Sequence, residues 1–282
     1  MHGPAAFGNG PAAIVLDAAN PRRRARALDD LSGGFRRWRL ARALAWLDIR
    51  NRYRGSVLGP FWLSLSTAVM LVGLGVLYSI LLRVEVRDYL PFLGISLICW
   101  NLIAQTVTDA CTAFTAAEGP IRQMPLPYTV HVLRVVLRNA IIAAHNLPLI
   151  VIIFLIFGLV PDWGLLLLPL GLLLLGINAF AVSMLLGMVC ARFRDVAQIV
   201  TSLMQIAFFM TPIIWKPDAL KESAWIVLFN PFYVIMETVR APLIEGGGSI
   251  LVWVAAILAT AVIAAISFAF FVRFRGRVAF WV

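Results

Sequence analysis

The sequence predicts an all-α integral membrane protein with six transmembrane helices. Of its 282 residues, 61% are hydrophobic and 13% are charged, and the mean hydropathy is +0.90. A soluble core of this size cannot bury so many apolar side chains. Six segments have the length of about 20 apolar residues that a bilayer requires, and they fall at residues 57–82, 90–108, 140–160, 165–189, 196–214 and 250–272.

The third of these spans is interrupted by polar and helix-breaking residues, His145, Asn146 and Pro148. Before the first span, arginines recur near the helical period on one side of the chain, and leucines and alanines lie on the other, with Asp48 breaking the pattern. Such a segment lies in the membrane surface. We therefore divide the chain into a mobile cytoplasmic tail (1–35), an amphipathic interface helix (36–56) and a six-span transmembrane domain (57–282).

The distribution of Lys and Arg orients this bundle. Of the 24 basic residues, 19 fall on the side that holds both termini, and five fall on the other. The positive-inside rule places the richer side in the cytoplasm. The net charge of +10 is thus a topology signal and an attraction to anionic membrane lipid. Nucleic-acid binding is not expected, because no separate basic domain exists for it.

The second inside loop, residues 112–133, is long and stiff. A glycine and three prolines occur within the stretch GPIRQMPLP at 119–127, directly after Glu118, and they enforce a rigid, broken element. Three apolar side chains are left to face a partner, Ile121, Met124 and Leu126. We interpret this loop as a docking knob for a cytoplasmic protein. The alternative is a stiff turn that packs on neighbouring helices.

The last outside connection, residues 215–248, is long and apolar. Its pattern predicts two short helices that are broken at Asn230 and Pro231, each too short to cross a bilayer. Irregular backbone at membrane depth requires cover by protein or by a water-filled cavity. A re-entrant gate at the outer mouth and an interfacial hairpin of aromatic anchors both fit. The candidate gate residues are Trp225, Phe229, Asn230, Pro231, Phe232 and Tyr233.

Two spans carry polar stripes at helical spacing. One comprises Asn101, Gln105, Thr108 and Thr112, and the other comprises Gln198, Thr201 and Gln205. In lipid such groups face the bundle interior, where they either bond neighbouring helices or line a wet path. Aromatic residues at the outer ends are typical of interfacial belts, and their rings also suit stacking on sugars. Our candidate channel-lining residues are Asn101, Gln105, Gln198, Gln205, Phe208, Phe209 and Trp215.

Several kinds of chemistry are missing from the sequence. Asp109 is the one candidate charge within or beside a span, which disfavours coupling to an ion gradient. The three histidines are scattered and no nucleophile and base are paired, so we expect neither an enzyme nor a metal site. The glycine-lysine signature of a phosphate loop is absent. ATP and Mg²⁺ would therefore bind a separate partner chain.

Five stretches together resemble a known family, the membrane subunits of type-2 ABC exporters of lipid-linked polysaccharides, which are the O-antigen and galactan export permeases. They are RYRGSVLGPFW at 52–62, GPIRQMPLP at 119–127, FFMTPIIW at 208–215, NPF at 230–232 and RVAFWV at 277–282. The resemblance implies a homodimer with two ABC ATPase subunits in a bacterial inner membrane. It also implies a channel between the two membrane subunits for a glycan on polyprenyl diphosphate.

The resemblance assigns roles to three parts of the chain. It maps residues 225–239 to the outer gate. It maps the inside loop to a helix that couples to the ATPase, with the coupling residues Glu118, Gly119, Ile121, Arg122, Pro125, Leu126 and Pro127. It maps the basic segment to an interface helix, whose arginines suit phosphate geometry and would meet the diphosphate through Arg39, Arg42, Arg50, Arg52 and Arg54.

Other functions stay open at this point. An ABC exporter of a drug or small lipid is the nearest rival. A secondary transporter would need inverted repeats and intramembrane charges, and a membrane-embedded glycan enzyme would need clustered acidic residues. The sequence leaves the glycan undefined among O-antigen, galactan, capsule and teichoic acid.

Overall fold

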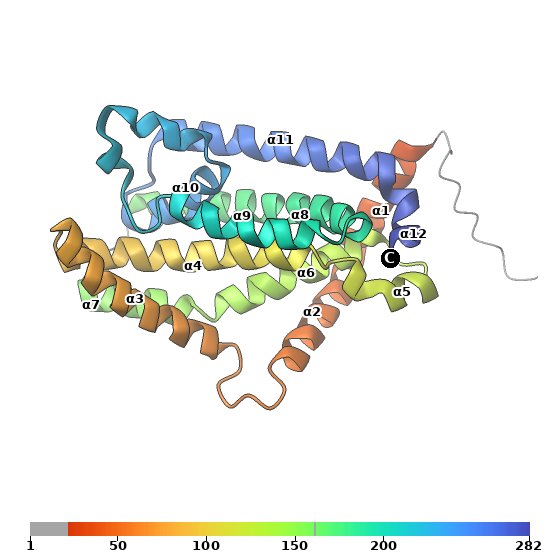
Figure 1. Cartoon of the computed structure of the whole chain (residues 1–282), viewed down its shortest axis with the longest axis horizontal. Helices are drawn as coiled ribbons and strands as arrows, with labels where there is room; N and C mark the ends of the chain where they lie inside the picture. The colour runs from red at the N-terminus through yellow and green to blue at the C-terminus, as the bar shows by residue number, and fades with distance from the viewer. Residues whose placement is uncertain (1–21, 161) are drawn as a thin grey trace, which may run out of the picture.

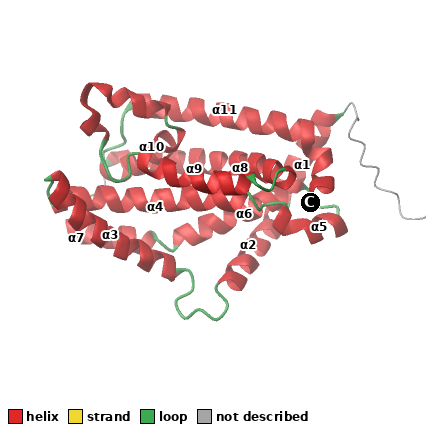
Figure 2. Ribbon diagram, in the orientation of Figure 1, coloured by secondary structure: helices red, strands yellow, loops and turns green. Residues whose placement is uncertain are grey.

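The computed structural model describes residues 22–160 and 162–282, and within them the regular elements are helices and no strand is formed (Figures 1 and 2). Long helices run side by side through the bundle and account for the predicted spans. They are α3 (Phe61–Leu82), α4 (Val86–Ala110), α6 (Tyr128–Ala144) followed by α7 (Leu147–Phe157), α8 (Leu168–Arg192), α9 (Val196–Met210) and α11 (Ile250–Phe274).

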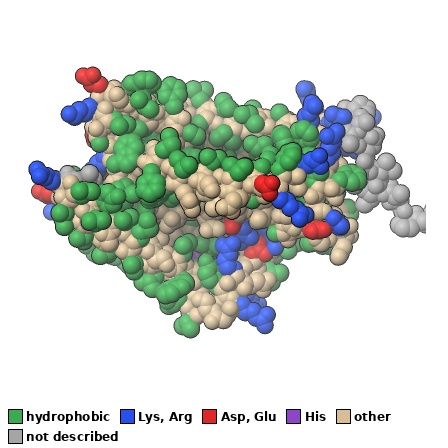
Figure 3. All heavy atoms as spheres, in the orientation of Figure 1, with side chains coloured by type: hydrophobic (Ala, Val, Ile, Leu, Met, Phe, Trp, Pro, Cys, Tyr) green, Lys and Arg blue, Asp and Glu red, His purple; other side chains and the backbone are tan. Residues whose placement is uncertain are grey.

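Shorter helices connect these long ones. They are η1 (Thr115–Ala117), α5 (Glu118–Gln123), η2 (Trp163–Leu167), η3 (Pro217–Phe229), α10 (Pro231–Ile244), η4 (Arg275–Arg277) and α12 (Val278–Trp281). The helices α1 (Arg23–Arg36), α5 and α12 gather at one end of the bundle (Figure 1). Hydrophobic side chains cover much of the side of the bundle, and the charged side chains in view lie toward its ends and beside α2 (Trp38–Arg52) (Figure 3).

Five helical segments are long and apolar enough to cross a membrane, and a bent pair of helices would raise this number to six. The predicted fifth span is shorter than expected. Its helix, α9, has 15 residues because Thr211 leaves the helical backbone at φ −93° and ψ 137°. Pro212 follows Thr211 directly, and a proline ring disfavours the α conformation of the residue before it.

The third span begins earlier than predicted. Helix α6 starts at Tyr128, so that Arg134 and Arg138 are helical residues and not loop residues. The expected interruption at His145 and Asn146 is present, and it separates α6 from α7. Ser64 of α3 donates a hydrogen bond of 2.8 Å to the carbonyl oxygen of His145, which satisfies a backbone group that the break releases.

The prediction of a mobile tail at residues 1–35 is wrong for residues 23–35, which are helical, and residues 1–21 lie outside the described residues. Helix α1 (Arg23–Arg36) packs on α6 and α11. Its Asp30 is 3% exposed and accepts hydrogen bonds from the backbone N–H groups of Tyr128 and Thr129. Asp30 therefore caps α6. Arg275 donates to the same carboxylate at 2.8 Å, so that α1 is held from two sides.

The predicted interface helix is α2 (Trp38–Arg52), which is shorter than the expected 36–56 because Arg37 and Tyr53 end the helical backbone. Its buried residues are Ala41, Ala45 and Ile49. Ala41 packs against Val130 and Leu133 of α6. The larger apolar side chains point away and are exposed: Leu40, Trp46 and Leu47. Small residues thus seat α2 on α6, and the bulky ones remain free.

The main core is built around α4. Ten consecutive residues of α4, 91–100, are buried, because α3, α8, α9 and α10 all pack against this helix. A second cluster at the end that holds α1 and α12 joins Ala27, Phe114, Met188, Phe271 and Val278. The helix ends are therefore fixed at that end of the bundle by apolar packing as well as by the Asp30 cap.

Candidate functional site

The predicted docking loop is a six-residue helix followed by extended chain. Helix α5 carries Glu118 and Arg122, whose side chains form an exposed ion pair of 3.0 Å. The backbone becomes extended at Met124, which is 50% exposed, while Ile121 packs against the second core cluster. Among the predicted coupling residues, Glu118, Gly119, Arg122 and Pro125 are exposed, and Ile121, Leu126 and Pro127 are half-buried.

The base of this loop is tied to the last residues of the chain. The Arg122 guanidinium donates a hydrogen bond of 2.5 Å to the carbonyl oxygen of Val282. Val282 is buried with Val278 in the second core cluster. The exposed tip of α5 is therefore carried on a fixed foundation, as a docking element requires.

A cluster of five charged side chains joins α2, α4 and α6. The Asp48 carboxylate accepts from Arg134 at 2.7 and 2.5 Å and from Arg138 at 3.1 Å. Arg138 also donates to Asp109 at 2.7 Å, and Arg52 reaches Asp109 at 3.4 Å. We call this group the inner charge cluster. It connects the interface helix to two spanning helices through ion pairs.

Within the inner charge cluster, burial alone would raise the pKa of Asp48, but Arg134 and then Arg138 outweigh it and hold that pKa below its ordinary value of 3.8. In the sequence Asp48 only interrupts the amphipathic pattern, and that pattern does not show its ion pairs. The available signal was the spacing of Arg134 and Arg138, because residues four apart share one face of a helix. Their acidic partners lie 29 to 90 positions away, so no local pattern shows them.

The predicted polar stripe on α4 faces α3 and the inner charge cluster. Asn101 donates to the Thr67 hydroxyl of α3 at 3.1 Å, and Gln105 donates to Asp109 at 2.8 Å. Thr108 bonds backbone carbonyls of its own helix. The Asn101 contact joins α4 to α3, which is the helix-to-helix role expected as the alternative to a wet path, while the Gln105 and Thr108 contacts stay within α4.

The stripe on α9 is arranged differently, because its members Gln198, Thr201 and Gln205 are exposed on the surface of the chain. Leu102, Ile103 and Thr106 of α4 line a space that residues of α9 also line. The two polar stripes therefore do not meet within one chain.

The aromatic candidates form one cluster at the C-terminal end of α9. Phe208 lies 5.9 Å from Trp100 and 5.2 Å from Phe209 between ring centroids. Trp100 also packs edge-on against Phe232, at 5.7 Å. The Trp215 indole donates to the Phe209 carbonyl at 3.1 Å. Phe209 is 69% exposed, which leaves one ring face of this cluster open for a ligand.

The outer connection is two helices broken at Asn230 and Pro231, as predicted, and the helices η3 and α10 bend by 107° at this break. The Asn230 side chain caps α10 by accepting from Phe232 and Tyr233. The two halves differ in burial. Trp225 and Phe229 of η3 are 59% and 78% exposed, whereas every residue of α10 from 233 to 242 is buried.

Helix α10 carries two charges that sequence analysis missed. Arg240 is 0% exposed and Glu237 is 4% exposed, and the two form an ion pair. Arg240 also donates to the Ser96 hydroxyl at 2.7 Å and to the Pro212 carbonyl at 2.8 Å, and its guanidinium lies 4.2 Å from the Phe92 ring centroid. The expectation that Asp109 is the one such charge is therefore wrong, because the apolar context of α10 hid a pair spaced three residues apart.

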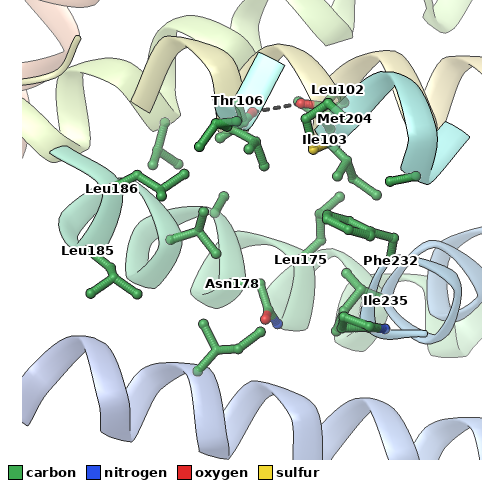
Figure 4. A pocket seen from close by; sticks show the side chains of 18 of the residues that line it. Leu102, Ile103, Thr106, Leu175, Asn178, Leu185, Leu186, Met204, Phe232 and Ile235 are labelled. Carbon is green, nitrogen blue, oxygen red and sulfur yellow. Dashed lines mark hydrogen bonds between the residues drawn. The ribbon is translucent and has the colours of Figure 1, made fainter. Parts of the chain in front are cut away.

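An apolar cavity of about 720 Å³ lies between α4, α6, α8 and α9. Leu175 and Leu186 come from α8, Met204 from α9, and Ile103 from α4, and all point into this space (Figure 4). Asn178 also lines it, but its amide donates to Thr260 and to the Leu174 carbonyl. Ligand pockets typically measure about 300 to 1,000 Å³, so the volume of this cavity lies within the range of ligand pockets.

The arrangement suits binding and movement better than covalent chemistry. Among the residues that the structure describes, no group of three His, Cys, Asp or Glu side chains is placed to hold a metal ion. The buried Arg240 and Glu237 pair with each other. The exposed amides of Gln198 and Gln205 and the exposed Phe209 ring lie on α9, and the exposed Trp225 and Phe229 rings lie on η3.

Comparison with known proteins agrees with this interpretation. A family model described as "ABC-2 type transporter" matches residues 39–244. The O-antigen export system permease protein RfbA of Klebsiella pneumoniae is 26% identical over 189 residues, which cover 65% of this chain and 72% of that protein. The RfbA protein of Myxococcus xanthus is 23% identical over 202 residues, which cover 71% and 78%. The chain is therefore a member of the ABC-2 type transporter membrane family.

Proposed function

We propose that this chain is the membrane subunit of an ATP-driven exporter that moves a polysaccharide, linked to polyprenyl diphosphate, across the bacterial inner membrane. The relatives are named as O-antigen export permeases, and they supply the substrate class. The chain itself provides the path and not the energy, so two ABC ATPase subunits bind the ATP and Mg²⁺. Both termini lie in the cytoplasm, and residues 57–282 act as one transmembrane domain.

The exposed stripe on α9 is the single observation that carries this proposal. Gln198, Thr201 and Gln205 are exposed on a helix that also exposes Ser202 and apolar residues such as Ile199 and Leu203. Lipid does not satisfy amide groups, so such residues face protein or water. A second copy of the chain opposite α9 would cover the stripe and leave a polar path between the two subunits. The exposed Phe209 and Trp225 rings would then meet the sugars.

The cytoplasmic parts convert ATP binding into motion in this scheme. Helix α5 docks on the ATPase through its exposed ion pair and Met124. Helix α2 lies in the membrane surface with Trp46 and Leu47 toward lipid, and its exposed arginines meet lipid phosphate. The inner charge cluster connects α2 to α4 and α6, so that movement of α2 reaches the spans. The bent pair η3 and α10 enters the outer leaflet and returns, and its exposed half closes the outer mouth.

Export of a small lipid or drug by the same ABC machinery is the second candidate, and the apolar cavity favours it, because its lining matches a small hydrophobic ligand. The two functions predict different stimulation of the assembled transporter. A lipid-linked glycan should raise ATP turnover if a polysaccharide is the substrate. A panel of small amphiphiles should do so in the other case.

The decisive experiment removes the gene for this chain and follows lipid-linked glycan. We expect glycan on polyprenyl diphosphate to accumulate at the cytoplasmic face, and the unaltered chain to restore its export. A matched pair tests the path: Gln205→Leu removes an exposed amide from α9, and Ile257→Leu changes an exposed apolar residue on α11. The first should slow export and the second should not. Unchanged glycan distribution in the deletion strain would contradict the proposal.

A further inference from the structure

The chain just beyond α9 is held more firmly than α9 itself. Residues 211–214 are all buried, and Thr211 and Ile213 are 0% exposed. Two backbone carbonyls in this stretch accept hydrogen bonds from side chains of other elements. Arg240 of α10 donates to the Pro212 carbonyl at 2.8 Å, and Tyr89 of α4 donates to the Ile214 carbonyl at 2.6 Å.

A third side chain completes this arrangement. Asn230, at the break between η3 and α10, donates to the Thr211 hydroxyl at 3.0 Å and to the Met210 carbonyl at 3.3 Å. We name residues 210–214, with Tyr89, Asn230 and Arg240, the outer clasp. Displacing residues 210–214 would take the Pro212 carbonyl from Arg240 and the Ile214 carbonyl from Tyr89, and leaving buried polar groups without partners is unfavourable.

Helix α9 itself is loosely packed along its length. Its buried residues are Val200 and Met204. The apolar cavity is lined by six residues of α9, which run from Val200 to Met210. Packed interiors resist movement because every atom has close neighbours. A helix beside an open space of about 720 Å³ has room to move.

We propose that α9 works as a lever that pivots at the outer clasp and swings toward the cavity, which it lines from Val200 onward, with Tyr89, Asn230 and Arg240 as the positioning residues of the pivot. This deepens the proposed function and rests on it, because α9 borders the path there. The inner end of α9 follows α8 through a connection of three residues, 193–195, all of which are exposed. That end is thus free to move while the outer end stays fixed.

The first test fills the cavity without touching the exposed side of α9. A Cβ added at Gly176, which lines the cavity, meets no atom within 4 Å, so Gly176→Leu places a new side chain in open space. Ala179 also lines the cavity, so Ala179→Leu enlarges a second lining residue. Ala261→Leu on α11 is the matched control, because Ala261 is exposed and lies outside the cavity lining. We expect the two filling variants to lower export of lipid-linked glycan about tenfold or more in the full transporter, and the control to export normally.

The second test measures the pivot by amide hydrogen exchange in the full transporter, with and without ADP-vanadate trapping. We expect the amides of Thr211, Ile213 and Ile214 to exchange slowly in both states and those of residues 196–203 to change between them. Tyr89→Phe removes one hydrogen bond and keeps the ring, so it should fold and raise exchange at Ile214 roughly tenfold. Its export should slow, and export by a Tyr78→Phe control should not.

The outcomes separate the two proposals. If the unaltered transporter exports glycan but Gly176→Leu and Ala179→Leu export equally well, α9 is not a lever and the proposed function stands. Equal changes in exchange at both ends of α9 would also overturn the lever. If the unaltered transporter moves no glycan at all, the proposed function itself fails.

Discussion

Replacement of Asp48 by Asn should loosen the interface helix from the bundle. The change removes the negative charge that Arg134 and Arg138 share through three hydrogen bonds of 2.5 to 3.1 Å. The side chains of Asp48 and the two arginines are 14%, 21% and 14% exposed. Breaking a fully buried pair costs about 3 to 5 kcal/mol, and an exposed pair contributes about 0 to 1 kcal/mol.

The intermediate burial places the expected loss near 2 kcal/mol, because Asn still accepts one hydrogen bond and water reaches part of the site. The loss should act locally, since α2 packs on α6 mainly through Ala41, Ala45 and Ile49. A change of 2 kcal/mol in local opening corresponds to about thirtyfold faster amide exchange. Hydrogen exchange of residues 41–49 in the purified membrane protein measures this directly.

The matched control neutralises a carboxylate in an exposed pair. Glu118 and Arg122 are 49% and 60% exposed, so Glu118→Gln should change the stability of its helix by no more than about 0.5 kcal/mol. A double-mutant cycle of Asp48→Asn with Arg134→Gln should recover a coupling energy of about 1 to 2 kcal/mol. Unchanged exchange of α2 in Asp48→Asn, or additivity in the cycle, would refute the assignment of the inner charge cluster as the tie between α2 and α6.

Three further predictions follow from the same structure. The purified chain alone should hydrolyse no ATP. The coupling variants Glu118→Ala, Arg122→Ala and Leu126→Asp should still assemble with the ATPase but lose glycan-stimulated ATP turnover. Normal export by all three variants would favour the interpretation of the loop as a stiff turn. Single cysteines at Gln198 and Gln205, made without Cys99, Cys111 and Cys190, should react with water-soluble thiol reagents when the transporter is trapped open. Ionised Asp48 should contribute fully to the attachment of α2 above pH 3.8. This contribution should be lost as the pH falls through the pKa of Asp48 in the folded protein, which lies below 3.8. Amide exchange rates of α2 measured at acid pH test this.

The elements that sequence analysis predicted well are those in which neighbouring residues determine the outcome. Continuous apolar runs specified the long helices of the bundle, because a hydrocarbon solvent requires internal backbone hydrogen bonds. The Asn230 and Pro231 pair specified the break before α10, since proline starts a helix and asparagine caps it. The stiff loop at 119–127 followed in the same way from its prolines. The resemblance to polysaccharide exporters rested on these same local stretches, and the family assignment confirms it.

Tertiary contacts decided the rest. Residues 23–36 have few local signals for order, yet α1 is held at the start of α6. Asp30 accepts a hydrogen bond from the Thr129 backbone N–H. Gly34 packs so closely on Thr129 that a Cβ added at Gly34 would lie 2.3 Å from the Thr129 side chain. The charges of Asp48 and Arg240 are tolerated because partners far along the chain neutralise them. The sequence alone thus determined that the chain lies in a lipid bilayer, where its spans fall and where its helices break, because these properties depend on residues that are close neighbours in the chain. Only the fold decided which charges pair, which stripe is exposed and where α9 is anchored, because those properties depend on side chains that the packing of distant helices brings together.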